Sequence, residues 1–418
     1  MKKVLIIGGG FAGLNAAKKL GGCIDFEVTL IDRRNHHLFQ PLLYQVAMAG
    51  LSPADIASPI RSLLSKYSNI SVLQGSAKKV LGGEKKVICD IGTFEYDYLI
   101  LACGARHSYF GHEAWEAHAP GLKTLNQATE IRRRVLSAFE KAESSTNDTD
   151  IKKAMTFVIV GGGPTGVELA GAIGEMSRFT LKKDFRNIDA SQTRIILIEA
   201  GERILAIFDE DQSVRAQRDL EKLGVQVWPS SIVTNIDAEG VQVGDETIMA
   251  DTVLWAAGVE ASPLGKTLDS ELDRQGRVTV EADLSLKQYP DIFVAGDQAH
   301  CKGKGDRPLP GMAPVATQQG VYIAKVLKAR ERDLESKPFK YVDKGKMATI
   351  GRSRAIVHTG KLKFNGFFAW LVWLFIHIFY LSGFQNRLFV FLKWSWSYLS
   401  FSRGARLIVG KRWRFYDE

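Results

Sequence analysis

The chain has 418 residues, of which 45% are hydrophobic and 24% are charged, so it can bury a sizeable core and is neither disordered nor fibrous. A chain of this length is expected to form two or three domains. The four cysteines lie far apart, without metal-ligand or CxxC spacing, which argues against a disulfide framework, a redox-active pair and a cysteine metal site.

The net charge of +9 is concentrated near the C-terminus. Residues 341–418 contain thirteen Lys or Arg and three Asp or Glu, so the rest of the chain is close to neutral. The same stretch is rich in Trp and Phe. A basic, aromatic segment on a near-neutral body favours contact with an anionic membrane surface over contact with a nucleic acid.

The N-terminal elements form a nucleotide-binding motif. Residues 4–7 are an apolar run typical of a buried parallel strand. Gly8, Gly10 and Gly13 follow with Gly-x-Gly-x-x-Gly spacing, then a helical pattern, and then a strand that ends in Asp32. This order predicts a dinucleotide site, with the pyrophosphate at the helix N-terminus and Asp32 bound to a ribose diol.

The same motif occurs a second time. Gly161, Gly163 and Gly166 follow another buried strand, and the acid at the end of the next strand is Glu199, after a polar insertion at 182–193. Two such motifs predict two dinucleotides, most economically one of flavin and one of nicotinamide. The Glu199 carboxylate would repel a 2′-phosphate, which favours NADH over NADPH.

Three further strands end in glycine turns. Residues 95–105 contain Gly104 in such a turn and residues 250–259 contain Gly258, each at the end of one nucleotide unit. Residues 289–300 contain Gly296 followed by Asp297, whose carboxylate could bond the ribityl hydroxyls of a flavin. Together with the two glycine motifs, this layout resembles the flavoprotein reductases that have two dinucleotide-binding domains.

Three other segments resemble the type II NADH dehydrogenases, single-chain NADH–quinone oxidoreductases that pump no protons. These segments are residues 36–61, 309–320 and 366–408, so the resemblance covers the chain from end to end. It implies non-covalently bound FAD, NADH as electron donor, a membrane quinone as acceptor and attachment through C-terminal helices. The missing cysteine pairs argue against disulfide reductases and sulfide–quinone reductases.

The motifs also indicate catalytic residues. Glu168 lies two residues past the second glycine motif, where it is placed to approach the nicotinamide side of the flavin; the alternative is an ordinary helix N-terminal acid. Gln318 and Gln319 are expected to begin a helix whose positive end stabilises a reduced flavin. The pair His36 and His37 is more typical of solvated side chains than of proton donors.

The resemblance implies two further sets of contacts. The expected quinone contacts are Tyr44, Gly50 and Gln318. The expected additional FAD contacts are Pro314 and Val315.

One departure from the family pattern concerns the quinone site. The pattern has Ala-Gln where this chain has Ala313-Pro314, and a proline has no side-chain donor for a quinone carbonyl. The partner of that carbonyl is therefore Gln318, Gln319, the backbone or water. The quinone is expected to enter between residues 44–51 and the C-terminal tail, residues 341–418.

The tail contains twenty-three residues without a charge, from Phe364 to Asn386, which is long enough to span a bilayer. His377 in the middle, scattered Trp and Tyr residues, and flanking cations favour helices that lie on the membrane surface instead. These cations include Lys361 and Arg403. One transmembrane helix is the alternative.

The predicted fold is α/β, with two Rossmann-like domains for FAD and NADH and an amphipathic, membrane-associated helical segment at the C-terminus. The expected divisions are 1–120 and 263–340 for FAD, 121–262 for NADH and 341–418 for the tail. We expect attachment to the cytoplasmic face of the inner (plasma) membrane. The sequence decides neither the quinone nor whether the protein is a homodimer, and the alternative functions are a reductase with a soluble acceptor and an NADH redox sensor.

Overall fold

The computed structural model describes residues 1–360, 362–381, 383–400 and 404–409. Lys361 and Arg403 lie outside these described residues. The chain divides into two compact units. Unit 1 comprises residues 1–38, 57–106 and 259–344, and unit 2 comprises residues 39–56, 107–258 and 345–418. The domain boundaries expected from the motifs stay a prediction.

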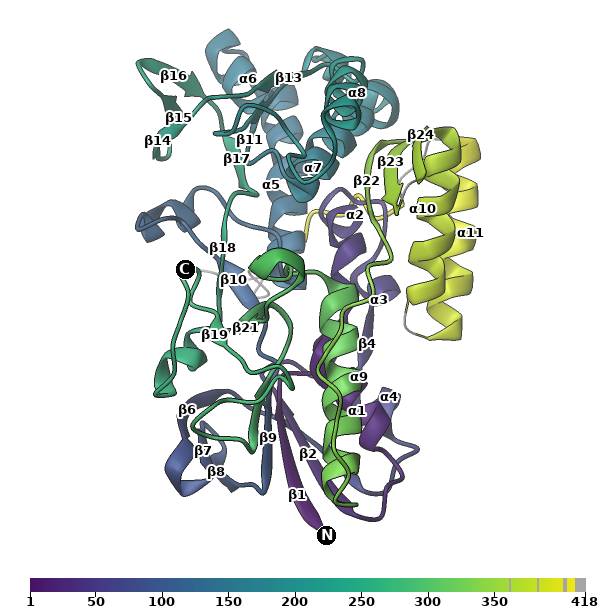
Figure 1. Ribbon diagram of the computed structural model, residues 1–418. Helices are drawn as coiled ribbons and strands as arrows, with labels where there is room; N and C mark the ends of the chain where they lie inside the picture. The colour runs from purple at the N-terminus through teal and green to yellow at the C-terminus, as the bar shows by residue number, and fades with distance from the viewer. Residues whose placement is uncertain (361, 382, 401–403, 410–418) are drawn as a thin grey trace, which may run out of the picture. The chain divides into compact units, whose positions relative to one another are not determined.

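Unit 1 is built on a five-stranded parallel sheet in the order β20–β9–β1–β2–β5 (Figure 1). Its strands are β1 (Lys2–Ile7), β2 (Phe26–Asp32), β5 (Ile70–Gln74), β9 (Tyr98–Leu101) and β20 (Ile292–Val294). The last four residues of β1 are all buried, as expected for a central strand covered on both faces. Val4 and Ile6 face one hydrophobic core, and Leu5 and Ile7 face another.

Helices cover one face of this sheet and a β-meander covers the other. Helices α1 (Phe11–Leu20) and α9 (Ala313–Arg330) pack side by side (Figure 1), and a Cβ added at Gly320 of α9 would overlap the carbonyl oxygen of Ala12. The meander consists of β6 (Ala77–Leu81), β7 (Lys86–Cys89) and β8 (Gly92–Glu95). The smaller elements are β3 (His36–Leu38), β4 (Ala57–Pro59), α4 (Ile60–Leu64), β10 (Ala105–His107), β18 (Val259–Ala261), β19 (Val278–Thr279) and β21 (Ala299–His300).

Unit 2 is built on a four-stranded parallel sheet in the order β13–β12–β11–β17. Every residue of β11 is buried, and helix α7 packs on this sheet. The sheet strands are β11 (Thr156–Val160), β12 (Arg194–Ile198), β13 (Val225–Trp228) and β17 (Thr252–Trp255), and an antiparallel sheet is formed by β14 (Val233–Ile236), β15 (Gly240–Val243) and β16 (Glu246–Met249). The helices are α2 (Leu43–Ala47), α3 (Pro53–Ile56), α5 (Leu125–Ser144), α6 (Asp148–Ala154), α7 (Pro164–Glu175) and α8 (Glu210–Glu221).

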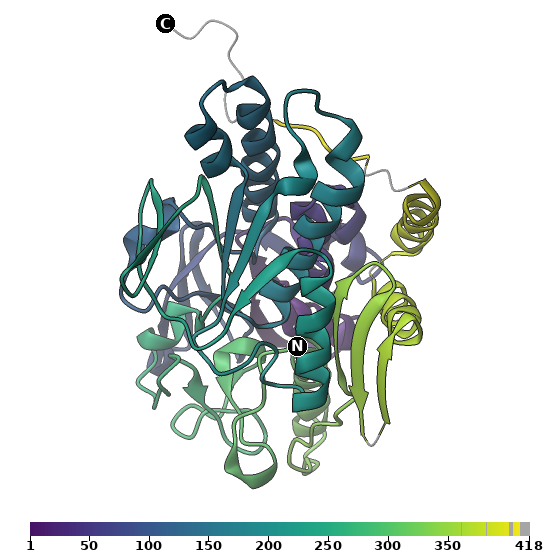
Figure 2. The same ribbon diagram turned by 90° about the horizontal axis from the view of Figure 1, so that it is seen from above.

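The C-terminal tail begins with an antiparallel sheet and continues with two helices (Figure 2). Its elements are β22 (Lys346–Gly351), β23 (Arg354–Thr359), β24 (Leu362–Gly366), α10 (Phe367–Tyr380) and α11 (Phe384–Ser400). Strand β22 lies so close to α7 that a Cβ added at Gly171 would overlap the carbonyl oxygen of Ile350. Helices therefore make up only the later part of the predicted tail.

The uncharged run in the tail does not form one helix. Strand β24 takes its first residues, and Gly366 and Gly383 turn the backbone with φ of 75° and 87° on either side of α10. Among the residues that the structure describes, no helix is both long and apolar enough to cross a bilayer.

Candidate functional site

The first glycine motif forms a tight turn between β1 and α1 in unit 1. Gly8 has φ of +106°, and a Cβ there would overlap the carbonyl oxygen of Ala102, so only glycine fits. A Cβ at Gly13 would overlap the carbonyl oxygen of Gly8, which lets helix and strand pack closely. At Gly10, by contrast, an added Cβ would meet no protein atom within 4 Å. The space above this turn therefore fits a pyrophosphate group.

Asp32 lies beside this turn. Its Oδ2 atom accepts the backbone N–H of Gly9 at 2.6 Å, and its Oδ1 atom accepts that of Arg34 at 2.7 Å. A carboxylate can accept about four hydrogen bonds, so two backbone donors orient the group without exhausting it. This arrangement fits a ribose diol.

The second glycine motif has the same geometry in unit 2. Gly161 has φ of +109°, and a Cβ at Gly166 would overlap the carbonyl oxygen of Gly161. A Cβ at Gly163 would meet no protein atom within 4 Å. Glu199 accepts the N–H of Gly162 at 2.6 Å. The long insertion before β12 therefore leaves the acid in the same place relative to the turn as Asp32 has in unit 1.

The Gly296–Asp297 turn of unit 1 is fixed by helix α9. The side-chain oxygen of Gln319 accepts the backbone N–H of Gly296 at 2.7 Å, and Gln319 is only 1% exposed. The amide of Gln298 accepts the N–H of Cys103 at 3.2 Å and so joins this turn to the one that contains Gly104. Gly258 ends the corresponding turn after β17 in unit 2 with φ of +70°.

Helix α9 begins earlier than the sequence predicted. Its first residue is Ala313, so the expectation that Gln318 and Gln319 begin it is wrong. Pro314 and Val315 occupy the first turn of the helix. Proline is favourable there, because the N–H that it lacks would have no partner within the helix and its fixed φ matches the helical value. Gln318 instead exchanges two hydrogen bonds with the backbone of Val342, at 2.9 and 3.0 Å.

Glu168 lies in α7 and has an unusual protonation equilibrium. Burial raises the pKa of its carboxyl group to about 8, although the residue as a whole is only partly buried. A hydrogen bond from the backbone of Thr349 lowers the pKa and so offsets part of this rise. The carboxyl group is therefore mostly protonated at pH 7 and can donate a hydrogen bond. Sequence reasoning missed Thr349 because it belongs to β22, far along the chain from α7.

The expectation that His37 is solvated is wrong. The residue is 3% exposed, and its Nδ1–H donates to the carbonyl oxygen of Gly9 at 3.0 Å. Burial is the main reason why the pKa of His37 falls to about 4. The reason for its position is the pairing of β3 with β4, which carries the ring under the first glycine turn and against Phe11. His37 is thus a neutral support of that turn.

Tyr44 and Gly50, two of the predicted quinone contacts, lie in the part of unit 2 that spans residues 39–56. The Tyr44 hydroxyl accepts a hydrogen bond from Gln45 at 3.0 Å, and the N–H of Gly50 donates to the carbonyl oxygen of Gln45 at 2.7 Å. The tail helices contact this segment through Trp394 and Lys393. No sequence pattern predicts these tail contacts, apart from the isolated cation at position 393.

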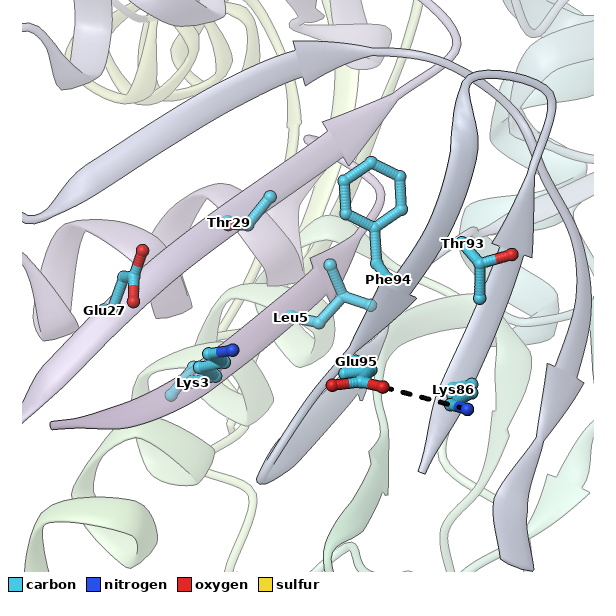
Figure 3. A pocket seen from close by; sticks show the side chains of 9 residues that line it. Lys3, Leu5, Glu27, Thr29, Lys86, Thr93, Phe94 and Glu95 are labelled. Carbon is cyan, nitrogen blue, oxygen red and sulfur yellow. Dashed lines mark ion pairs between the residues drawn. The ribbon is translucent and has the colours of Figure 1, made fainter. Parts of the chain in front are cut away.

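A separate pocket of about 530 Å³ lies on the sheet of unit 1 (Figure 3). Strands β1, β2 and β8 line it with Lys3, Glu27 and Phe94 among others, and an ion pair between Lys86 and Glu95 closes one side at 3.7 Å. The residues from β1 and β2 precede the ends of these strands, where the glycine turn and Asp32 lie. This pocket is therefore not the nucleotide site.

Comparison with known proteins places the chain in a family. Residues 2–320 match the pyridine nucleotide-disulphide oxidoreductase family. The chain is 43% identical to the type II NADH:quinone oxidoreductase Ndh of Mycobacterium tuberculosis, with 98% of this chain and 91% of the relative covered. It is 31% identical to the type II NADH:quinone oxidoreductase of Staphylococcus saprophyticus, with 84% and 88% covered.

Solved structures share the fold. The structure of NDH2 from Plasmodium falciparum in complex with NADH has a TM-score of 0.89 at 20% identity, over 98% of this chain and all of that one. The sulfide:quinone oxidoreductase from Aquifex aeolicus has a TM-score of 0.74 at 18% identity, over 93% and 92%. On the sequence matches, the chain belongs to the pyridine nucleotide-disulphide oxidoreductase family and, within it, to the type II NADH:quinone oxidoreductases.

Proposed function

We propose that the protein binds FAD in unit 1 and NADH in unit 2, oxidises NADH and reduces a membrane quinone to quinol without pumping protons. One observation carries the proposal: each unit contains the same glycine turn, in which the acid at the end of the next strand accepts a backbone N–H of the turn. A bound flavin would accept a hydride from the nicotinamide and pass two electrons to the quinone.

The residues of unit 1 would hold the flavin nucleotide. Gly8, Gly10 and Gly13 admit the pyrophosphate, Asp32 binds the ribose, and Asp297 binds the ribityl chain. The N-terminus of α9, an eighteen-residue helix, would place its positive end near the flavin ring, with Pro314 and Val315 in contact with it. Gln319 keeps the Gly296 turn in place, and Gly104 ends the neighbouring turn.

The residues of unit 2 would hold the electron donor. Gly161, Gly163 and Gly166 admit the NADH pyrophosphate, and Gly258 ends the facing turn. The Glu199 carboxylate would bind the ribose and repel the 2′-phosphate of NADPH. Glu168 would hold a proton on its carboxyl group near neutral pH and offer it as a hydrogen bond at the nicotinamide side.

The quinone would contact Tyr44, Gly50 and Gln318. The Gln318 amide has two N–H donors, and its bond to Val342 uses one of them. The second N–H remains available to a quinone carbonyl. Pro314 takes no part in that contact, since it has no side-chain donor.

The tail helices would attach the protein to the membrane surface. Large apolar side chains are exposed on both helices, with Phe368 72% exposed on α10 and Trp396 67% exposed on α11. An exposed apolar patch of this kind, together with the basic charge of the tail, fits an interfacial segment. We place it on the cytoplasmic face of the inner membrane, where NADH is available.

The experiment that tests this proposal is NADH oxidation by the purified flavin-loaded protein. The acceptors are a short-chain quinone, oxygen and ferricyanide, and the flavin released on denaturation is identified by mass. Rapid quinone-dependent turnover with bound FAD and weak use of NADPH is the expected result. Rapid reduction of ferricyanide without turnover of quinone would overturn the acceptor, and released FMN would overturn the cofactor.

A further inference from the structure

Lys393 of α11 forms an ion pair with Asp55 of α3 within unit 2. Its Nζ atom lies 2.7 Å from both carboxylate oxygens, and Asp55 is only 8% exposed. The Oδ2 atom also accepts the backbone N–H of Ser52 at 2.7 Å. A buried carboxylate depends on its partners to offset desolvation. The tail helix therefore helps to fix the loop between Gly50 and Asp55.

The neighbouring residue, Trp394, contacts the same segment at a second point. Its indole Nε1–H donates to the side-chain oxygen of Gln45 at 2.7 Å, and the Gln45 amide donates in turn to the Tyr44 hydroxyl at 3.0 Å. Gln45 also accepts the N–H of Gly50 through its backbone carbonyl. One chain of hydrogen bonds thus connects α11 with Tyr44, and a second contact of Gln45 reaches Gly50.

The opposite face of α11 is apolar and exposed. Val390 is fully buried and Trp394 is partly buried, whereas the residues between and around them are exposed. These exposed residues are Leu388, Phe389, Phe391, Leu392 and Trp396. The helix therefore presents one face suited to lipid while its other face carries the two contacts to residues 39–56.

We propose that Lys393 and Trp394 are positioning residues for quinone reduction, acting through Asp55 and Gln45 on Tyr44 and Gly50. This inference rests on the proposed function, because it takes Tyr44 and Gly50 as quinone contacts. Residues 39–56 reach the geometry that binds quinone only with α11 in place. Loss of either contact weakens quinone binding and leaves the reaction of NADH with the flavin unchanged.

The first test is Trp394→Phe, which keeps the aromatic ring and removes the indole N–H. We expect the KM for a short-chain quinone to rise about three- to tenfold in detergent solution, with kcat and the NADH–ferricyanide rate within about twofold of wild type. The matched control is Trp370→Phe, since Trp370 stacks on Phe367 and Tyr398 within the tail. This control is expected to leave the quinone KM unchanged.

The second test concerns the ion pair. Lys393→Met is expected to raise the quinone KM, and Lys393→Arg is expected to restore most of the affinity because it keeps a cation against Asp55. The matched control is Lys363→Met, which removes a tail cation that pairs with Asp209 at 2.5 Å. The Trp394→Phe result decides the matter if Lys393→Met fails to fold.

The outcomes separate this inference from the proposed function. A wild-type protein that reduces ferricyanide but no quinone overturns the proposed function. A wild-type protein that reduces quinone, with the same KM in Trp394→Phe and in Lys393→Met, overturns only the inference. A parallel fall of the ferricyanide and quinone rates also overturns it, because the residues would then support the fold in general.

Discussion

The side-chain oxygen of Gln319 in α9 accepts the backbone N–H of Gly296, so one buried amide ties a helix to the turn that ends β20. Gln319→Leu removes the acceptor and leaves a partly buried donor without a partner, which costs about 1–2 kcal/mol. We expect FAD to bind roughly five- to thirtyfold more weakly, since 1.4 kcal/mol is a factor of ten. Fluorescence titration of the flavin-free protein measures the change.

The control for this prediction is Gln318→Leu. Gln318 bonds to the backbone of Val342 and not to the flavin turn, so FAD affinity should stay the same. This variant should raise the quinone KM instead, and unchanged quinone turnover would count against a quinone contact by Gln318.

Two glycines permit a test that separates folding from nucleotide binding. Gly10 and Gly163 have extended backbones with φ of −72° and −71°, and an added Cβ would meet no protein atom within 4 Å. Alanine at either position should leave the Tm of the nucleotide-free protein unchanged. Gly10→Ala should lower the flavin content, whereas Gly163→Ala should retain flavin and raise the KM for NADH at least tenfold. A large fall in the Tm of either nucleotide-free variant would contradict this prediction, because the glycine would then be required for folding and not for nucleotide binding.

Glu168 should make stability depend on pH. Its pKa is about 8 in the folded protein and about 4.3 in an unfolded chain, so between these values the folded state binds the extra proton. The free energy of unfolding contributed by this group therefore falls as pH rises from about 4.5 to about 8 and is level above that. Urea unfolding at pH 5, 7 and 9 measures this slope, and Glu168→Gln should remove it. Equal slopes in the two proteins would contradict the raised pKa.

Glu199 should set the choice between NADH and NADPH. Its two carboxylate oxygens accept the N–H groups of Gly162 and Gly201 at 2.6 and 2.7 Å, which holds the negative charge at the expected ribose position. Glu199→Gln removes the charge and keeps one acceptor, so the ratio of kcat/KM for NADH to that for NADPH should fall about tenfold, or about 1.4 kcal/mol. Asp32→Asn serves as the comparison, with weaker flavin binding and no change of that ratio.

Local patterns predicted the glycine turns and the acids beside them, which lie within one strand–turn–helix unit, whereas their nucleotide contacts stay a prediction. The spacing of Gly8, Gly10 and Gly13 was sufficient, because the turn and the acid are fixed by neighbouring strands of one sheet. Glu199 is placed correctly despite the insertion at 182–193, because β12 still pairs with β11 and brings its last residues beside the second glycine turn. The family resemblance then supplied the acceptor, which no local pattern encodes.

Contacts between distant segments were not predictable in the same way. The buried position of His37 depends on the pairing of β3 with β4. The hydrogen bond from Thr349 to Glu168 depends on β22, which no feature of the tail sequence connects with α7. Each of these features arises from tertiary packing that overrides the local pattern.

The close approach of β22 to α7 at Gly171 decides where this protein could be shortened. A truncation at residue 341, where the basic tail begins, would remove β22 and so expose the side of α7 on which β22 packs. Helix α7 carries Gly166 and Glu168. It would also remove the Thr349 donor. A truncation that keeps β22 against α7 can begin only after Gly366, at α10. The tail therefore has two successive parts: loss of the first would disturb α7, whereas loss of the second would leave α7 covered and remove the contacts of Lys393 and Trp394 to residues 39–56.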